Sequence, residues 1–280
     1  MTIQPKAAVK DFWQRASCGE EAYALGPDEA TQLAAQAQVR YELEPYLPPF
    51  ANFARARGRE ILEIGVGMGA DHLRWAQAGP KRLTGVDLTP RAIAITQARL
   101  AHAKLTSQLQ VADAEALPFA AHSFDGVYSW GVLHHSPDTP AAFREVARVL
   151  RPGGWARIMV YHTYSLTGLM LWVRFALLRG RPFTSLAAIY SQYLESPGTK
   201  AYTVAEGRAL CRRAGLVPTR VWVQLNHGDL LQGVVGQRHR AGLTGHVLGL
   251  AQRIWPRWFF KTFTPFLGLY LMIEAEKPDA

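Results

Sequence analysis

The chain has 280 residues, of which 49% are hydrophobic and 19% are charged, so it is long and apolar enough to bury one large core. This composition excludes a disordered protein, and its two cysteines, Cys18 and Cys211, lack the C-x-x-C spacing of a zinc site or redox motif. The net charge of +9 favours anionic partners, but the arginines are scattered rather than clustered, which predicts no nucleic-acid binding.

The first residues, MTIQPKAAVKDFW, are mixed and polar, unlike a secretory leader, and they predict a cytoplasmic protein. No apolar run reaches the roughly 18 to 20 residues needed to span a bilayer. Contact with a membrane would therefore have to be peripheral.

The N-terminal stretch predicts helices that lie outside any sheet. A short helix and loop are expected at residues 10–24, a helix capped by Asp28 at 28–47, and a further helical piece at 50–56. Two interpretations stay open, namely packing helices or a lid over a ligand. The aromatic candidates of this stretch for lining a substrate pocket are Trp13, Tyr23 and Tyr41.

Residues 59–69, REILEIGVGMG, predict a buried strand that runs into a glycine-rich turn. Such a turn lets the backbone approach a ligand closely, and the helix expected at 71–78 points its positive end toward that ligand. Gly65, Gly67 and Ala70 also fit the G-x-G-x-x-G/A pattern of nicotinamide and flavin sites. On this stretch alone, dinucleotide binding and binding of another nucleotide remain alternatives.

Strands and helices then alternate, which predicts a parallel sheet with helices on both faces and a ligand at the carboxyl ends of the strands. Asp87 ends the second strand about 20 residues after the first glycine, where a carboxylate can accept hydrogen bonds from ribose hydroxyls. The later strands are expected at 82–88, 109–112, 124–130 and 155–162, with helices at 90–103 and 139–150.

The ordered motifs EIGVGMG, GVDLTP, VADAEALPF, SFDGVYSWGVLHH and LRPGG resemble those of class I S-adenosylmethionine-dependent methyltransferases. The likeness covers about residues 59–162 and is strongest to the small-molecule and quinone-pathway branch, with a methyltransferase type 11-like domain. It implies an α/β fold with a Rossmann-like, doubly wound, seven-stranded sheet whose last strand is antiparallel. A dehydrogenase is disfavoured because no Tyr-x-x-x-Lys follows the fourth strand.

The resemblance also implies S-adenosyl-L-methionine as the cofactor, bound across the strand ends. By motif position, the methionine part would meet Glu63, Gly65 and Gly67, the ribose Asp87, the adenine Leu88, Asp113 and Ala114, and the sulfonium Trp130.

Beyond residue 162 the chain is longer than a minimal methyltransferase. An apolar helix is expected at 165–178, a helix with a Thr203–Glu206 capping box at 203–214, and strands at 217–224 and 269–276. About 45 residues separate those strands, and loops of that length are usually functional or structured. Two helices are expected there, at 243–254 and 256–263. One continuous domain is thus expected, with a helical lid at 1–58, a cofactor-binding core at 59–162, and the rest of the sheet with helical substrate-cover inserts at 163–280.

The methyl group of a sulfonium is already activated, so the enzyme must mainly align the acceptor, and a base is needed only for an acceptor such as a hydroxyl. The catalytic candidates are His135 and Tyr161. His134 and Trp172 are further candidates for lining the substrate. His134, His135 and Asp138 have metal-ligating side chains, but no metal is expected because adjacent histidines rarely share one ion.

The last insert concentrates aromatic and basic residues, which predicts an apolar substrate cover and peripheral membrane contact. The acceptor would then be a small apolar or aromatic molecule. Two alternatives remain, namely aromatics that belong to the core, and a catalytically silent cofactor-binding or membrane-surface protein on the same fold. The aromatic residues concerned are Trp255, Trp258, Phe259, Phe263 and Phe266. Arg253, Arg257 and Lys261 would form a basic stripe if the helix were continuous, but Pro256 favours the start of a new helix and a bent stripe.

Overall fold

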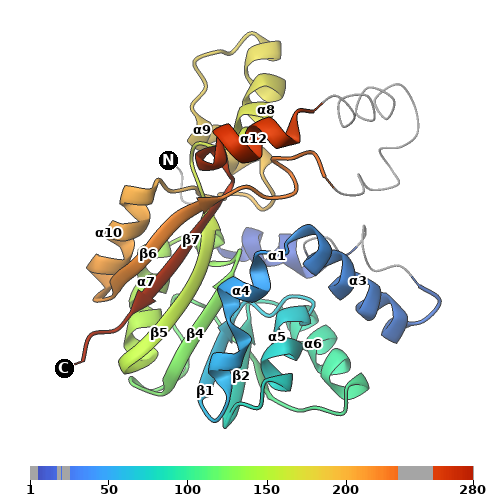
Figure 1. Cartoon of the computed structure of the whole chain (residues 1–280), viewed down its shortest axis with the longest axis vertical. Helices are drawn as coiled ribbons and strands as arrows, with labels where there is room; N and C mark the ends of the chain where they lie inside the picture. Colours follow the sequence, from blue (N-terminus) through green and yellow to red (C-terminus); the bar gives the residue numbers. More distant parts are fainter. Residues whose placement is uncertain (1–5, 18–19, 21–25, 233–254, 280) are drawn as a thin grey trace.

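The computed structural model describes residues 6–17, 20, 26–232 and 255–279. Seven of its strands form one sheet in the order β3-β2-β1-β4-β5-β7-β6 (Figure 1). The strands are β1 (Glu60–Ile64), β2 (Arg82–Asp87), β3 (Gln108–Val111), β4 (Phe124–Trp130), β5 (Leu150–Tyr161), β6 (Val217–Gln224) and β7 (Tyr270–Glu276).

The sheet has the predicted topology. Strands β1 to β5 pair in parallel, whereas β7 is antiparallel to both β5 and β6. The order reverses between β1 and β4, and ligands of open parallel sheets bind at such a switch point, at the carboxyl ends of the strands. The expected fold class, with its antiparallel last strand, is therefore confirmed.

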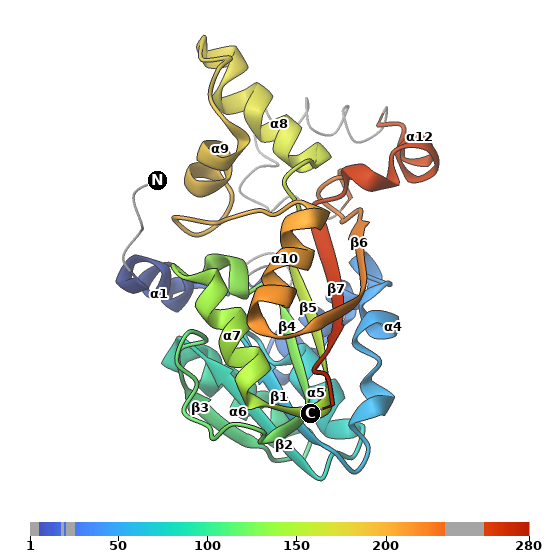
Figure 2. The ribbon, with the colours of Figure 1, turned by 90° about the vertical axis from the view of Figure 1, so that its left-hand side faces the viewer.

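Helices cover both faces of the sheet (Figure 2). The core on one face is mainly aliphatic and includes α7 and α10, whereas the core on the other face is rich in aromatic residues and includes α4, η1 and α5. The helices of the core and the N-terminal part are α1 (Lys6–Arg15), α3 (Glu29–Leu43), α4 (Leu47–Ala51), η1 (Phe53–Ala56), α5 (Ala70–Gln77), α6 (Pro90–His102), η2 (Leu133–His135), α7 (Thr139–Val149) and α10 (Val204–Ala214).

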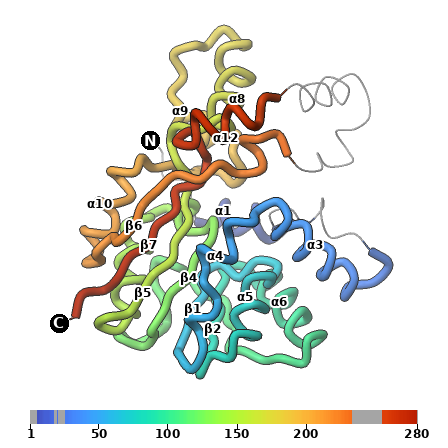
Figure 3. The backbone as a smooth tube through the Cα atoms, viewed as in Figure 1, coloured from blue at the N-terminus to red at the C-terminus, as the bar shows by residue number. Residues whose placement is uncertain are grey.

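The inserts gather at one end of the sheet, away from the C-terminus (Figure 3). Their apolar contacts form a small cluster in which Phe260 and Leu267 pack against Leu166, Leu225 and Leu230. The helices of this end are α8 (Leu166–Phe175), η3 (Leu177–Arg179), α9 (Leu186–Tyr193), α12 (Arg257–Phe263) and η5 (Pro265–Leu267).

Most predicted elements appear with small shifts at their ends. The Asp28 side chain caps α3 by accepting from the Thr31 amide, and Thr203 and Glu206 form the expected capping box of α10. The helix expected at 243–254 and the pocket candidate Tyr23 lie outside the described residues.

Two expectations about elements were wrong, and one helix was not predicted. The first helix begins at Lys6 rather than at residue 10. Strand β5 begins at Leu150, because this residue pairs with Phe124 before a bulge, so LRPGG belongs to the strand. Helix α9 was not predicted. It is capped by Ser185, and its own residue Tyr190 is fully buried.

Candidate functional site

A cavity of about 300 Å³ opens at the carboxyl ends of β1, β2 and β4, beside the switch point of the sheet. The N-terminal helices and the segment after α9 complete its wall. Most of the residues singled out from the sequence line it, namely Glu63, Gly65, Gly67, Asp87, Leu88, Asp113, Ala114, Trp130, His135, Tyr161 and Trp13.

The glycine turn forms the floor of this cavity. Gly65, Gly67 and Gly69 have φ of 84°, 51° and 74°, a region that strongly favours glycine. A Cβ on Gly65 would meet Val132 Cγ2 at 2.1 Å, so the backbone is packed against the segment after β4. The turn thus exposes main-chain groups to the cavity, which a side chain at Gly65 would prevent.

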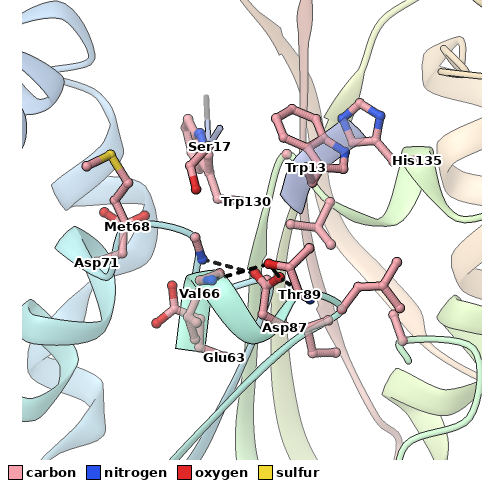
Figure 4. A pocket seen from close by; sticks show the side chains of 18 of the residues that line it. Trp13, Ser17, Glu63, Val66, Met68, Asp71, Asp87, Thr89, Trp130 and His135 are labelled. Carbon is pink, nitrogen blue, oxygen red and sulfur yellow. Dashed lines mark hydrogen bonds between the residues drawn. The ribbon is translucent and has the colours of Figure 1, made fainter. Parts of the chain in front are cut away.

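Asp87 is fixed at the centre of the floor (Figure 4). Its Oδ2 accepts from the Gly67 amide at 3.1 Å, and its Oδ1 accepts from the Thr89 amide and hydroxyl, both at 2.9 Å. Burial raises the pKa of Asp87, and the bonds from the Thr89 and Gly67 amides oppose this shift. These three hydrogen bonds leave the carboxylate able to accept from a ligand hydroxyl.

Two buried carboxyl groups stand behind the glycine turn. Glu63 Oε2 lies 2.8 Å from His72 Nδ1, and His72 Nε2 lies 2.7 Å from the Ser107 hydroxyl. Burial and the nearby Asp71 raise the pKa of Glu63 well above its usual value, and burial lowers the pKa of His72 to about 3. Both shifts favour a neutral Glu63–His72 pair at neutral pH.

Asp71, at the start of α5, accepts hydrogen bonds from three neighbouring side chains. It accepts from Arg40 Nε at 3.1 Å and Nη2 at 2.7 Å, from the Tyr41 hydroxyl at 2.9 Å, and from the Tyr128 hydroxyl at 2.8 Å. Four donated hydrogen bonds therefore fix the position of this buried carboxylate. Arg40 and Asp71 both line the cavity, so they offer opposite charges to a ligand.

Helix α1 closes the cavity on the side of Asp113. Lys6 Nζ forms an ion pair with Asp113 and lies 2.7 Å from Glu115 Oε2. The indole of Trp13 packs edge-to-face on His135, with ring centroids 5.1 Å apart and planes at 67° (Figure 4). A helix outside the sheet thereby touches both ends of the cavity.

His135, in η2, is buried and oriented by two hydroxyl groups. Its Nδ1 lies 2.8 Å from Ser196 Oγ and 3.1 Å from Thr199 Oγ1. The Thr199 hydroxyl donates to the Ser196 carbonyl at 2.6 Å, so its oxygen can only accept from the imidazole. This bond favours the tautomer with a hydrogen on Nδ1 and a lone pair on Nε2, which lies 3.4 Å from Glu195 Oε2.

An aromatic wall with two carboxyl groups lies beside His135. Trp130 ends β4, and Tyr161 and Tyr270 are register partners on β5 and β7. Glu44, which caps the end of α3, and Glu195, which follows α9, bond to the tyrosine hydroxyls. Glu44, Glu195 and Tyr270 are not among the candidates predicted from the sequence, because no motif links these separated segments.

Three sequence candidates do not line the cavity. The Tyr41 hydroxyl is bound to Asp71 behind it, and the Trp172 indole donates to the Thr184 carbonyl at 3.0 Å in the α8 insert. His134 is fully buried against Tyr161, with ring centroids 4.0 Å apart. Ligand atoms of His134, His135 and Glu195 lie within 4.8 Å of one another, and the expectation of no metal stays a prediction.

The insert at 255–267 presents aromatic side chains to solvent. Trp258 and Phe263 are 69% and 57% exposed, and no residue of α8 or α12 lines the cavity. Helix α12 begins at Arg257 with Pro256 as its N-cap, as the sequence predicted for a new helix, and Arg257 donates to the Leu230 carbonyl at 2.9 Å. No helix in the described part of the chain is long and apolar enough to cross a bilayer.

Residues 62–158 match the model of a family described as a methyltransferase domain. An uncharacterized protein of Mycobacterium tuberculosis is 39% identical over 114 residues, which are 41% of this chain and 41% of that protein. Erythromycin 3''-O-methyltransferase of Saccharopolyspora erythraea is 32% identical over 184 residues, which are 55% of this chain and 59% of that protein. The chain thus spans 41% to 59% of the length of these relatives.

Among solved structures, geranyl diphosphate C-methyltransferase of Streptomyces coelicolor superposes with a TM-score of 0.61 and 14% identity. The match covers 99% of this chain and 98% of that one. At this identity the likeness establishes a shared fold and nothing about the acceptor.

Proposed function

Residues 62–158 are a methyltransferase domain, as the sequence motifs predicted, and on this premise we propose that the chain transfers a methyl group from S-adenosylmethionine to a small acceptor. The main support for this proposal is that one cavity is lined both by the glycine turn with Asp87 and by the oriented imidazole of His135. A catalytically silent protein would not need that imidazole, which is why we favour an enzyme.

The residues present fit the cofactor. The Gly65 turn has a positive φ and a close approach to Val132 that a Cβ would disrupt, Asp87 retains capacity to accept from ribose hydroxyls, and the Arg40–Asp71 pair offers opposite charges to a methionine zwitterion. When bound, S-adenosylmethionine supplies an activated methyl group on a positively charged sulfur. The chain's own task is to bind, align and deprotonate the acceptor.

We assign proton removal to His135. Its Nε2 carries the lone pair, and the Ser196 and Thr199 oxygens hold the ring. Glu195 Oε2, 3.4 Å from Nε2, stabilises the imidazolium that forms when the acceptor hydroxyl loses its proton. Tyr161 is the positioning residue, because its hydroxyl donates to the same Glu195 oxygen at 2.7 Å.

The acceptor end of the cavity is walled by Trp130, Met159, Tyr161 and Tyr270, which supports a largely apolar or aromatic acceptor. The name of the erythromycin 3''-O-methyltransferase supports methylation of an oxygen atom on a small molecule. We propose this acceptor class and a lid role for the N-terminal helices, which exclude water from the site.

Peripheral membrane contact is a separate proposal, and it rests on the exposed rings of Trp258, Phe259, Phe263 and Phe266. Such rings insert at a lipid headgroup boundary. Co-sedimentation with phosphatidylglycerol vesicles should fall when Trp258 and Phe263 are both replaced by serine. Equal sedimentation of the variant would remove the proposal, and the protein would then be expected in the cytoplasm without membrane attachment.

Calorimetric titration tests the proposed function. S-adenosylmethionine and S-adenosylhomocysteine should both bind, and NAD should not. Turnover with a panel of acceptors of graded polarity should favour apolar alcohols and phenols. Binding of NAD without S-adenosylmethionine would overturn the assignment, and cofactor binding without any methyl transfer would favour the silent alternative.

A further inference from the structure

At the acceptor end, two tyrosines on neighbouring strands each donate a hydrogen bond to the carboxyl group of a glutamate. Tyr161 and Tyr270 are antiparallel partners, and their rings stack with centroids 6.1 Å apart and planes 10° apart. The Tyr270 hydroxyl donates to Glu44 Oε1 at 2.5 Å, and the Tyr161 hydroxyl donates to Glu195 Oε2 at 2.7 Å. The Trp130 ring meets Tyr270 edge-on at 5.4 Å. These five residues, which we call the Tyr–Glu wall, all line the cavity.

One carboxyl group of the wall is incompletely paired. Glu44 is 4% exposed, and its Oε2 accepts no hydrogen bond from any residue in the described part of the chain. The nearest cation is Arg40, whose Nη1 lies 3.5 Å from this oxygen while its Nε and Nη2 bond to Asp71. A buried, unsatisfied oxygen on an ionisable group is costly, so its presence beside a cavity points to a ligand.

The second carboxyl group is held in place at the expense of backbone strain. Glu195 has φ of 60°, in the left-handed region that few residues other than glycine adopt without cost. This conformation brings its carboxyl group between Tyr161 and His135. Glycine at position 195 would adopt this backbone conformation without strain. The presence of a glutamate there therefore suits its carboxyl group rather than the local backbone.

Aromatic faces and carboxylates together recognise a cation rather than a neutral group. The electron-rich faces of tyrosine and tryptophan attract ammonium ions, and a nearby carboxylate adds a charge pair that is weakly screened in a buried site. Proton removal by His135 uses only Glu195 and Tyr161 of the wall, so Glu44 is left without a part in that step. The carboxyl groups of the wall also outnumber the one guanidinium, that of Arg40, that lies beside Glu44.

We propose that the Tyr–Glu wall binds a positively charged nitrogen of the acceptor, which makes the acceptor class an amine-bearing alcohol or phenol, with Glu44 and Glu195 as the charge partners. This inference rests on the proposed function, because it names the acceptor of the same site. It adds a charge to the apolar acceptor expected from the sequence. A neutral acceptor would leave Glu44 Oε2 with no charge partner nearer than Arg40 Nη1 at 3.5 Å, whereas a cationic nitrogen next to it adds a charge pair in a buried site.

The test uses two probes of equal shape and different charge. Choline and its neutral carbon isostere 3,3-dimethyl-1-butanol are titrated into the full chain saturated with S-adenosylhomocysteine, with calorimetry and tryptophan fluorescence as readouts. Choline should bind at least about tenfold more tightly than the isostere. Glu44→Gln and Glu195→Gln should each reduce choline affinity by about fivefold or more and leave the isostere unchanged.

Glu42→Gln is the matched control, because Glu42 is exposed on α3 and bonds to Gln38 rather than to the wall. It should bind choline like the unaltered chain. Equal affinity of the two probes, or full choline affinity in both wall variants, overturns the inference. Should Glu44→Gln fail to fold, Glu195→Gln decides alone, since Glu195 is only partly buried.

Failure of the proposed function is distinguishable from failure of this inference. If S-adenosylhomocysteine does not bind, the proposed function fails, and the same titrations without it still decide whether the wall prefers a cation. If S-adenosylhomocysteine binds and choline shows no preference over the isostere, the inference fails and the methyltransferase proposal stands.

Discussion

The two ends of the cavity are built in different ways. At the cofactor end, Gly65, Gly67 and Asp87 come from two adjacent strand ends, and main-chain groups fix the carboxylate. At the acceptor end, Glu44 and Glu195 follow the ends of two helices, lie 151 residues apart in sequence and are fixed by side-chain hydroxyls. The first end is defined by local backbone geometry, and the second only by the packing of the whole fold.

The two ends should therefore respond differently to substitution. A backbone cradle tolerates changes of distant side chains, since its donors are amides held by strand pairing. A site built from side chains changes its shape and charge when any one of those residues is substituted. We therefore expect variants at the cofactor end to alter binding of the nucleotide, and variants at the acceptor end to alter turnover while nucleotide affinity is kept.

The largest expected effect is at the acceptor end. His135→Asn should lower kcat by about 10²- to 10⁴-fold for a hydroxyl acceptor, the usual contribution of a general base, with unchanged affinity for S-adenosylhomocysteine. Steady-state kinetics and calorimetry measure the two quantities. His102→Asn, on the exposed face of α6, is the control. A His135→Asn enzyme with wild-type kcat would mean that the acceptor needs no base.

At the cofactor end, Asp87→Ala removes the carboxylate that holds the glycine turn and that is proposed to accept hydrogen bonds from the ribose hydroxyls. We expect S-adenosylhomocysteine binding to weaken by about 1 to 3 kcal/mol, or roughly 5- to 150-fold in Kd, the range for hydrogen bonds to a charged group. Calorimetry checks this value. Asp279→Ala, at the exposed C-terminal end, should bind normally. An unchanged Kd for S-adenosylhomocysteine in Asp87→Ala would mean that Asp87 does not bind the ribose.

Two buried histidines extend the comparison to stability. His72, near the cofactor end, has partners on both ring nitrogens, whereas neither nitrogen of His134 has a hydrogen-bond partner among the described residues. Burial, with smaller effects of His135 and Lys200, lowers the pKa of His134 well below its usual value. The native state thus keeps His134 neutral while the unfolded chain gains a proton below about pH 6.5, so stability is lost as pH falls.

His134→Leu removes that proton uptake. Relative to the unaltered chain, the variant should gain about 2 kcal/mol in unfolding free energy between pH 8 and pH 5, since pH 5 lies about 1.5 units below the unfolded pKa. Urea denaturation at the two pH values gives the difference. His72→Leu should instead lose about 1 to 3 kcal/mol at pH 8, because Glu63 and Ser107 lose their partner. Equal losses of unfolding free energy at pH 8 in His134→Leu and His72→Leu would contradict this contrast between the two histidines.

The same contrast explains what could be predicted from the sequence. The sheet, the caps and the cofactor end follow from short motifs whose residues are neighbours in the fold as well as in the chain, such as the Gly65 turn and Asp87. Glu44 could not be predicted, since it caps a surface-like helix and meets Tyr270 only through the antiparallel pairing of β7. Trp172 was expected to line the substrate on residue type alone, but its indole bonds within the insert.

The smallest expected effect concerns the proposed lid, where Lys6 joins α1 to Asp113 and Glu115. Ion pairs of partly exposed lysines contribute about 0 to 1 kcal/mol, so Lys6→Ala should speed S-adenosylhomocysteine release by no more than about fivefold. Because Debye screening shortens to about 3 Å at 1 M salt, the difference from the unaltered chain should shrink there. Stopped-flow dissociation at low and high salt measures both. Lys10→Ala, one helical turn away and exposed, should release the nucleotide at the normal rate. If Lys6→Ala and Lys10→Ala behave alike at low salt, α1 packs beside the site without holding it closed, and the lid would have to be sought in α3.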